Sequence, residues 1–428
     1  MQLATGECSG STPEHAQSGE GIAVDLTIRA RLSAMMFLQY FVWGAWFVPF
    51  ATYLTHHGLQ DSVGTIYSAQ GWAAIAAPLF VGAIADRYFS AEKVMGILHL
   101  FAGALLFLLS SVGADAGVMF FATLGVLLAY MPTIALSNSV ALNAISDTEK
   151  QFPAIRVFGT IGWIVAGLIV GLVLPGEAER TQMPLYLAGA VSLVYGLYSF
   201  TLPNTPPQAG QGKPSIVSLL GLDAIRNSDR SFWVLIICSM LMMIPFSFYN
   251  VYANPFLDDI GVQNPAATQT IGQVSEVGFL LLLPLFFRWV GIKGVLFIGM
   301  AAWAVRYVLF ANGFTADGPI MPIIYLGLAL HGVGFDFVFV AATIWVGKHF
   351  AADARSRAQS FLALKTWGVG YLIGSNAANA VQVGTGAGAG PEWQSFWLLP
   401  AGFAAVTAVV FLLLFRDRGE KAVAPAAV

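Results

Sequence analysis

The sequence has little charge and little cysteine for its length. Only 10% of its 428 residues are Asp, Glu, Lys or Arg, whereas a soluble protein usually carries about 25%. The two cysteines, Cys8 and Cys238, are too few for a disulfide framework. These shortages exclude an ordinary water-soluble protein and a disulfide-rich secreted domain.

The sequence also lacks the motifs of several enzyme classes. It contains no paired His or Cys ligands for a metal, no Gly-Lys loop for a phosphate and no soluble catalytic or output domain. A membrane enzyme or a sensor is therefore a weak alternative, and we expect no catalytic residues, no cofactor, no metal and no nucleic-acid partner. Residues 1–28 are polar and lack the apolar segment of a cleaved signal peptide, so we predict a disordered cytoplasmic tail.

Long apolar runs occupy most of the remaining chain. Hydrophobic residues make up 57% of the sequence, and the mean hydropathy is +0.72. Because a helix needs about 20 apolar residues to cross a bilayer, these runs predict an all-α membrane protein with twelve transmembrane helices. The predicted spans are 32–54, 64–86, 92–113, 117–142, 153–174, 183–202, 231–256, 269–288, 293–312, 319–347, 358–382 and 394–415.

One long polar interval, 203–230, divides the predicted helices into six and six. Its Pro/Gly/Gln-rich start is typical of a flexible linker. We therefore predict an N-terminal bundle over 29–202, a cytoplasmic linker over 203–230, a C-terminal bundle over 231–415 and a cytoplasmic tail over 416–428. Two bundles of similar size are typical of a transporter, and we expect it to work as a monomer.

The Lys and Arg residues fix the orientation of this arrangement. Cytoplasmic loops of membrane proteins carry an excess of positive charge. If the N-terminus is cytoplasmic, all Lys and Arg residues outside the spans lie on the inner side except Arg180. This bias predicts a multi-pass protein of the inner (plasma) membrane with both termini in the cytoplasm.

Three charged residues lie deep within the predicted second bundle. Glu276, Arg306 and Asp336 are about 18 to 20 Å from the inner ends of their helices, at about 1.5 Å per residue, and so lie near the midplane of the bilayer. A charge there costs roughly 2.5 to 3.5 kcal/mol. The three side chains could form a structural ion pair, but one cation cannot fully serve two carboxylates. The second acid is then available to exchange a proton, as a proton-coupled carrier requires.

Polar and aromatic side chains share helix faces with these charges or lie on neighbouring spans. Spacings of three, four or seven residues place side chains on one face, and amides, hydroxyls and rings together suit a flat polar ligand with hydrogen-bonding edges. Packing, snorkelling toward water and a neutral core histidine are the alternative interpretations. The groups are Gln39, Trp43 and Trp46; Asn138; Arg156, Thr160 and Trp163; Ser247 and Asn250; Gln273 and Glu276; and His331, Phe335 and Asp336.

A short loop motif and several longer segments resemble a known family. Gly82-x-x-x-Asp86-Arg87 is similar to the inner-loop signature of the major facilitator superfamily, in which a tight turn and a charge pair latch the cytoplasmic ends of the bundles. Within that superfamily the chain resembles the nucleoside:proton symporters, the bacterial nucleoside and xanthosine permeases, from about residue 34 to 415. The segments are FLQYFVWGAW, YMPTIALSN, FPAIRVFGTIGW, LLGLDA, QVSE and GFDF.

The resemblance implies roles for several residues. In that family the ligand lies between the bundles, against the Arg and Thr of an IR-x-x-GT segment, which are Arg156 and Thr160 here, with Trp163 at a usually aromatic position. It also implies ligand contacts for the residues that match the family's positions on the seventh, eighth and tenth helices. These residues are Asn250, Gln273, Glu276, Phe335 and Asp336.

Two positions depart from the family pattern. Ser247 stands where a glutamine is expected, and His331 stands where a tyrosine is expected. The loss of an amide removes a partner for a base or sugar edge, so the substrate range is open at these positions.

The favoured hypothesis is nucleoside import by proton symport through alternating access. Asp336 or Glu276 takes up the proton, and Glu276 contacts the ligand. The alternative is a proton-coupled or facilitative carrier of sugars or other small polar neutral molecules.

Overall fold

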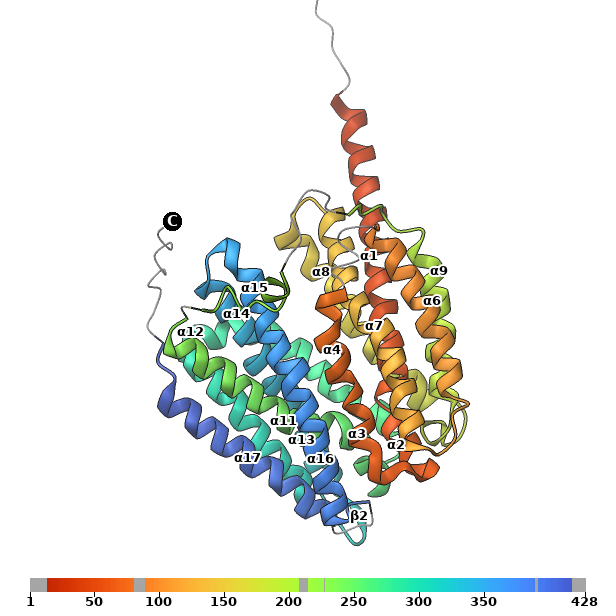
Figure 1. The fold of residues 1–428 in the computed structure, drawn as a ribbon, viewed down its shortest axis with the longest axis vertical. Helices are drawn as coiled ribbons and strands as arrows, with labels where there is room; N and C mark the ends of the chain where they lie inside the picture. Colours follow the sequence, from red (N-terminus) through yellow and green to blue (C-terminus); the bar gives the residue numbers. More distant parts are fainter. Residues whose placement is uncertain (1–13, 81–88, 208–214, 227, 389–391, 418–428) are drawn as a thin grey trace, which may run out of the picture.

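The computed structural model describes residues 14–80, 89–207, 215–226, 228–388 and 392–417, and it is predominantly helical (Figure 1). Among these residues, eight helical segments are long and apolar enough to cross a membrane. In the same residues the strands are β1 (Phe314–Thr315) and β2 (Gly318–Pro319), which pair as a short antiparallel hairpin. The protein is therefore a helical membrane protein.

The first half of the chain forms one group of helices, drawn from red to yellow-green in Figure 1. Short π-helical and 3₁₀ turns connect or extend the longer helices. The elements are α1 (Glu14–Phe47), α2 (Phe50–Leu54), η1 (Thr55–Leu59), η2 (Gln60–Ser62), α3 (Val63–Tyr67), α4 (Ala69–Phe80), α6 (Ala91–Leu109), α7 (Ala116–Ala144), α8 (Thr148–Leu168), η4 (Ile169–Val173), η5 (Ala178–Arg180) and α9 (Met183–Ser199).

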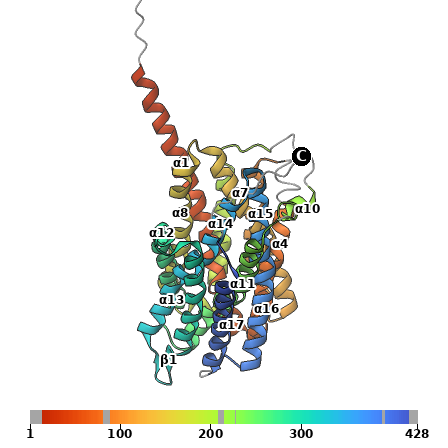
Figure 2. The same ribbon diagram turned by 90° about the vertical axis from the view of Figure 1, so that its left-hand side faces the viewer.

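The second half forms a second group beside the first, drawn from green to blue (Figures 1 and 2). A short helix, α10 (Ile216–Leu219), lies in the predicted linker. The remaining elements are α11 (Arg230–Asp259), α12 (Pro265–Ala311), α13 (Met321–Phe335), η6 (Asp336–Val340), α14 (Ala341–His349), α15 (Ala352–Ala363), η7 (Leu364–Gly370), α16 (Tyr371–Thr385) and α17 (Glu392–Leu414).

A glycine breaks the longest of these elements, α12. Gly291 has φ = 65°, a left-handed conformation that a residue without Cβ adopts readily. It lies between the predicted spans 269–288 and 293–312. Glu276 and Arg306 both lie close to His331, although 30 residues of straight helix would separate them by about 45 Å. The chain therefore doubles back at Gly291.

Two of the predicted segments lie partly or wholly outside the residues that the structure describes. The predicted disordered tail spans 1–28, but α1 already begins at Glu14 and runs directly into the apolar helix that follows. A helix that is already nucleated extends at low cost through residues such as Ala and Glu. The loop motif of Gly82, Asp86 and Arg87 lies in 81–88, outside the described residues.

Close helix crossings bring the site residues together. A Cβ added at Gly162 would lie 2.2 Å from the Phe37 carbonyl oxygen, and one added at Gly332 would lie 2.5 Å from the Ser275 carbonyl carbon. Only glycine fits at such crossings, as is common in membrane helices. The first contact joins α8 to α1, and the second joins α13 to α12 beside Glu276.

Candidate functional site

Glu276 lies on α12 at the crossing with α13. Its carboxylate Oε2 is 3.9 Å from Nε2 of His331, and 23% of its side chain is exposed. Gln273, one turn earlier, is half-buried. Arg156 of α8, in the first half of the chain, acts electrostatically on the same carboxylate. Glu276 is therefore flanked by groups from both halves.

Arg306 is completely buried and holds His331 in place. Its Nη1 lies 2.9 Å from Nδ1 of His331, and its guanidinium carbon lies 3.4 Å from the centre of the Tyr249 ring. Because a guanidinium can only donate, the imidazole accepts at Nδ1, and its remaining proton is on Nε2, facing Glu276. The hypothesis that Arg306 pairs with an acid is thus replaced by contact through His331.

Asp336 occupies the first position of the π-helical turn η6, a kind of irregularity that is frequent at functional sites. The side chain is 0% exposed. Within the part of the chain that the structure describes, neither of its carboxylate oxygens has a hydrogen-bond partner. An unpaired buried carboxyl group is costly, and it is therefore a candidate for proton exchange.

The α8 face carries three half-buried site residues that the sequence predicted, namely Arg156, Thr160 and Trp163. The Arg156 guanidinium lies 4.1 Å from the centre of the Tyr40 ring, and the Trp163 ring lies 5.4 Å from that of Trp43. These contacts fix a cation and an indole on the helix that approaches α12.

Gly167 of α8 and Gly171 of η4, which continues α8, allow that approach. A Cβ at Gly167 would lie 2.9 Å from the Thr270 methyl carbon, and one at Gly171 would lie 2.7 Å from the Ala267 Cβ. The two helices are thus in contact one to two turns away from Trp163 and Glu276. This packing sets the Arg156 face of the first half against the Glu276 face of the second.

Two further residues that the sequence predicts for the site lie on α11. The Asn250 side chain is half-buried, and its Oδ1 accepts a hydrogen bond of 2.5 Å from the Tyr371 hydroxyl. Ser247 is fully buried and donates to the Met243 carbonyl oxygen. Ser247 therefore lies inside the second half, whereas Asn250 remains partly accessible.

An aromatic group adjoins these residues. The Phe335 ring stacks on His331 at 5.6 Å between centroids, and it also lies 6.3 Å from the Trp367 ring. Phe335 is half-buried. It provides an apolar surface beside His331, whose Nε2 lies 3.9 Å from the Glu276 carboxylate.

Two predicted ligand residues lie in the first half, away from Glu276. Gln39 is 0% exposed; its Nε2 donates to Thr133 at 2.8 Å, and its Oε1 lies 3.2 Å from His99 Nε2. The Gln39 amide thus belongs to an internal polar network. Asn138 on α7 is half-buried, and its Oδ1 has no partner among the described residues.

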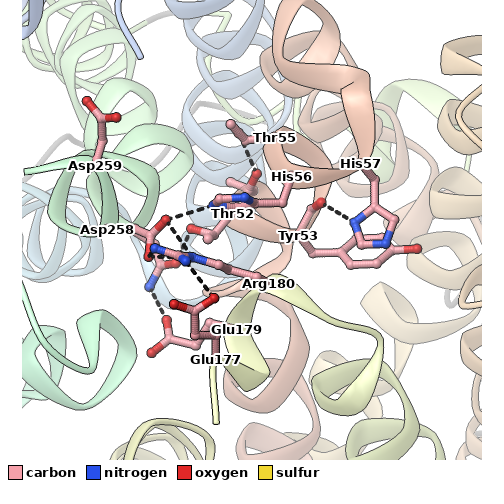
Figure 3. A network of polar contacts seen from close by, with 12 residues as sticks. Thr52, Tyr53, Thr55, His56, His57, Glu177, Glu179, Arg180, Asp258 and Asp259 are labelled. Atoms are coloured by element: carbon pink, nitrogen blue, oxygen red, sulfur yellow. Dashed lines mark hydrogen bonds and ion pairs between the residues drawn. The ribbon is translucent and has the colours of Figure 1, made fainter. Parts of the chain in front are cut away.

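A second polar cluster joins the two halves at the end of the molecule that carries the hairpin β1–β2, and Figure 3 shows its central part. Asp258 at the end of α11 accepts from Arg180 of η5, with Nη2 to Oδ1 at 3.0 Å, and from His56 of η1 at 2.9 Å. Arg180 also pairs with Glu177 at 2.6 Å. We call this region the closed end, because ion pairs cross it from one half to the other.

Glu179 makes a buried contact across the closed end. Its carboxylate accepts from Asn254 Nδ2 at 2.8 Å and from the Ala266 backbone N–H at 3.0 Å, in the first turn of α12. Asn254 in turn accepts a hydrogen bond from Thr52. Burial outweighs these donors and raises the pKa of Glu179 to about 7. This side chain in a connector of the first half thus caps a helix of the second half.

Asn379 ties a further corner of the closed end. Its Oδ1 accepts from the Gly64 backbone N–H at 2.9 Å, and its Nδ2 donates to the Asp61 carbonyl oxygen at 2.8 Å. Sequence reasoning missed the whole closed end, because its residues lie in short connectors and near the ends of helices. The lone position of Arg180 on the predicted outer side was the available signal.

Comparison with known proteins identifies the family. The sequence profile described as Nucleoside H⁺ symporter matches residues 26–420. YegT of Escherichia coli K12 is 39% identical over 401 residues, covering 91% of this chain and 94% of YegT. The xanthosine permease and the nucleoside permease NupG of the same strain are 34% and 32% identical, each over 91% of this chain and 96% of the relative.

Solved structures agree with this assignment. The crystal structure of the nucleoside transporter NupG matches with a TM-score of 0.81 at 32% identity, over 91% of this chain and 100% of that one. A peptide transporter of the POT family, at 14% identity and a TM-score of 0.70, shares the fold. The relatives are transporters and not enzymes, and the chain belongs to the nucleoside H⁺ symporter family.

Proposed function

We propose that this chain imports nucleosides together with protons across the inner membrane, by alternating access in a twelve-helix major facilitator fold. The observation that carries the proposal is Glu276, a partly exposed carboxylate flanked by Arg156 of one half and by His331 of the other. A carboxylate in this position can accept hydrogen bonds from ribose hydroxyls. Family membership supplies the class of substrate and the coupling ion.

The surrounding residues have distinct roles in this proposal. Arg156, Thr160 and Gln273 offer donors and acceptors to the nucleoside, Asn250 offers its amide, and Trp163 and Phe335 cover the faces of the base. Asp336 exchanges the proton, because it is buried without a partner beside Glu276, with which it interacts electrostatically. Gln39 and Ser247 are engaged inside their own halves and support the binding helices.

The orientation follows from the positive charges. Arg180 is the one cation that the sequence places outside, and it lies at the closed end. The closed end is therefore the outer side in this proposal, both termini are cytoplasmic, and the structure corresponds to a form whose outer gate is shut. Bundles over 29–202 and 231–415 would then rock about the central site.

Uptake of labelled uridine into proteoliposomes, driven by an inward proton gradient, tests the binding role. Glu276→Gln should reduce uptake about 10- to 100-fold, because a hydrogen bond to a charged acceptor contributes about 1.5–3 kcal/mol. Asp317→Asn, at an exposed position in the turn between β1 and β2, is the matched control. Full gradient-driven uptake by Glu276→Gln would refute the assignment, and uptake of hexoses in place of nucleosides would favour a sugar carrier.

The coupling role of Asp336 is tested separately. Asp336→Asn should abolish accumulation of uridine against its gradient, because no carboxyl remains to carry the proton. Exchange of labelled for unlabelled uridine across the membrane should continue, since this exchange needs no net proton movement. Uptake by Asp336→Asn that still follows the pH gradient would exclude Asp336 from coupling.

A further inference from the structure

The Glu179 carboxyl receives its hydrogen bonds across the boundary between the two halves at the closed end. It belongs to η5 in the first half, but its hydrogen-bond donors, Asn254 and the Ala266 backbone N–H, belong to the second half. Six per cent of the residue is exposed. When the halves separate at this end, the carboxyl must leave these donors and return to water.

We propose that Glu179 is a proton-binding group of the outer gate. Its carboxyl group takes a proton from the external solution and becomes buried in the protonated form when the gate closes. The inference rests on the proposed alternating-access function, but it concerns a site apart from Glu276 and Asp336. It assigns a second proton to the cycle, one that acts on the gate and not on the ligand.

The sign of the effect follows from burial. Closure removes the Glu179 carboxyl from water, which favours the neutral form and raises its pKa from 4.5 to about 7; the neighbouring Asp258 adds to this rise, and hydrogen bonds and Arg180 oppose it. A raised pKa in the closed form means that closure takes up a proton as the pH falls below about 7. By linkage, the equilibrium for closure should rise about twentyfold from pH 7.5 to pH 5.5.

Other charged groups around Glu179 do not change this sign. Asp258 is paired with Arg180 and His56, and Arg180 is also paired with Glu177. On the α12 side, the groups nearest to Glu179 are backbone N–H groups of the first helical turn, which carry a partial positive charge. His56 also contacts Asp258 across the two halves, so the experiment includes a variant of His56 beside that of Glu179.

A pocket next to the carboxyl gives it a route to solvent. This pocket has a volume of 320 Å³, and it lies at the closed end between the two halves. Glu179 can therefore exchange its proton with the solution at this end without passing the central site. The lining includes Glu177, Glu179, Arg180, Asp258 and residues 261–265.

The direction suits a proton-driven importer. External acid would protonate Glu179 and favour closure of the outer gate after substrate has bound. While the gate is shut, Glu179 is not in contact with the cytoplasmic solution, so the lower proton concentration there would not deprotonate it. Acid outside thus promotes the inward-facing form through Glu179, in addition to any proton that Asp336 carries.

The test measures the gate directly, without substrate. Spin labels at Gln60→Cys and Gln263→Cys, exposed positions in the two halves, are introduced after replacing Cys8 and Cys238 by Ser. Distances between the labels are then measured in nanodiscs from pH 7.5 to pH 5.5 by double electron–electron resonance. In the otherwise unchanged chain the short-distance, closed population should grow on acidification by about twentyfold in equilibrium ratio.

Matched variants assign the effect to Glu179. Glu179→Gln resembles the protonated form and should stay closed at every pH, whereas Glu177→Gln and His56→Gln should keep the pH dependence. Asn254→Asp leaves Glu179 in place and sets a second carboxyl beside it, so the midpoint of closure should move to higher pH.

Several results would overturn the proposal. It fails if the labelled chain shows no pH-dependent closure, if Glu179→Gln retains that dependence, or if Asn254→Asp leaves the midpoint unchanged. Uridine exchange by the same samples separates the two ideas. Normal uridine exchange together with a pH-insensitive gate would refute the Glu179 proposal alone. A pH-sensitive gate without uridine exchange would refute the nucleoside assignment alone.

Discussion

At the scale of single residues, the proposed site depends on a buried cation, Arg306, that forms no ion pair with an acid among the described residues. Arg306 donates to His331 and lies against the Tyr249 ring, so the electron-rich face of an aromatic ring and an imidazole nitrogen take the place of a carboxylate. His331 then presents its other nitrogen to Glu276. The orientation of the Glu276 carboxylate is thus supported from the interior of the second half.

Replacing this cation tests its contribution to stability. Arg306→Met should lower the free energy of unfolding by about 2 kcal/mol, the contribution of a desolvated cation–π contact. Thermal unfolding of the purified protein in detergent measures the change. Arg288→Met, at an exposed position on the same element α12, should leave the midpoint unchanged, and an equal loss in both variants would contradict the assigned role of Arg306.

The sequence could predict which of these residues are deep, but not which ones touch. Depth follows from counting residues along a helix, and Glu276 and Asp336 were found in this way. Contact depends on the rotation of each helix about its axis and on the neighbouring rings. The sequence therefore offered an acid as a possible partner of Arg306 and left Gln39 among the ligand residues, where the structure shows it bonded to Thr133 and His99.

At the scale of elements, the crossing of α12 and α13 positions the acid. Gly332 of α13 lies against the backbone of Ser275 and Glu276, where a Cβ would approach to 2.5–2.6 Å. The helices can lie this close only because no side chain separates them. Any widening of the crossing would move the Glu276 carboxylate away from His331.

An alanine at this crossing should show the effect. Gly332→Ala should destabilise the protein by about 1–3 kcal/mol through overpacking and should also weaken uridine binding. Gly278→Ala, on the same α12, has open space around the added methyl group and should be neutral or slightly stabilising. Thermal unfolding and a binding titration measure both effects, and equal behaviour of the two variants would contradict this account of the crossing.

Much of the helical pattern was predictable, because the length of each hydrophobic run can be counted directly from the sequence. The predicted spans 269–288 and 293–312 lie on either side of Gly291, and α12 covers both of them up to Ala311. The π-helical turns η4, η6 and η7 were not predicted, because a change from one hydrogen-bond register to another leaves no trace in hydropathy. Asp336 lies at the start of one such turn.

At the scale of the whole molecule, the closed end joins the two groups of helices, which come from the first and the second half of the sequence. Asp258 of the second half pairs with Arg180 and His56 of the first half. Glu179 of the first half accepts a hydrogen bond from the Ala266 N–H of the second half. No sequence pattern predicts such contacts, because they depend on how the halves are placed relative to each other. The positive charges predicted the orientation, and packing decided which connectors meet.

Removing the shared acceptor should loosen this end. Asp258→Asn should shift the gate toward the open form by about fivefold, since an ion pair of this kind contributes up to about 1 kcal/mol. The same spin-label distances measure the shift. Lys150→Gln, which removes an ion pair within one half, should not alter them, and a closed population that is the same for Asp258→Asn and the parent chain would contradict the role of Asp258.

The hydrogen bonds of Asn379 restrict which sequence changes are tolerated at the closed end. Among the described residues, Asn379 bonds the opposite half through main-chain groups, the Gly64 N–H and the Asp61 carbonyl oxygen, and it accepts a further bond from Tyr252 of its own half. A Cβ at Gly64 would lie 2.3 Å from the Ser375 carbonyl oxygen. Related proteins are therefore free to exchange the side chains at 60–62, whereas positions 64 and 379 should be inherited together.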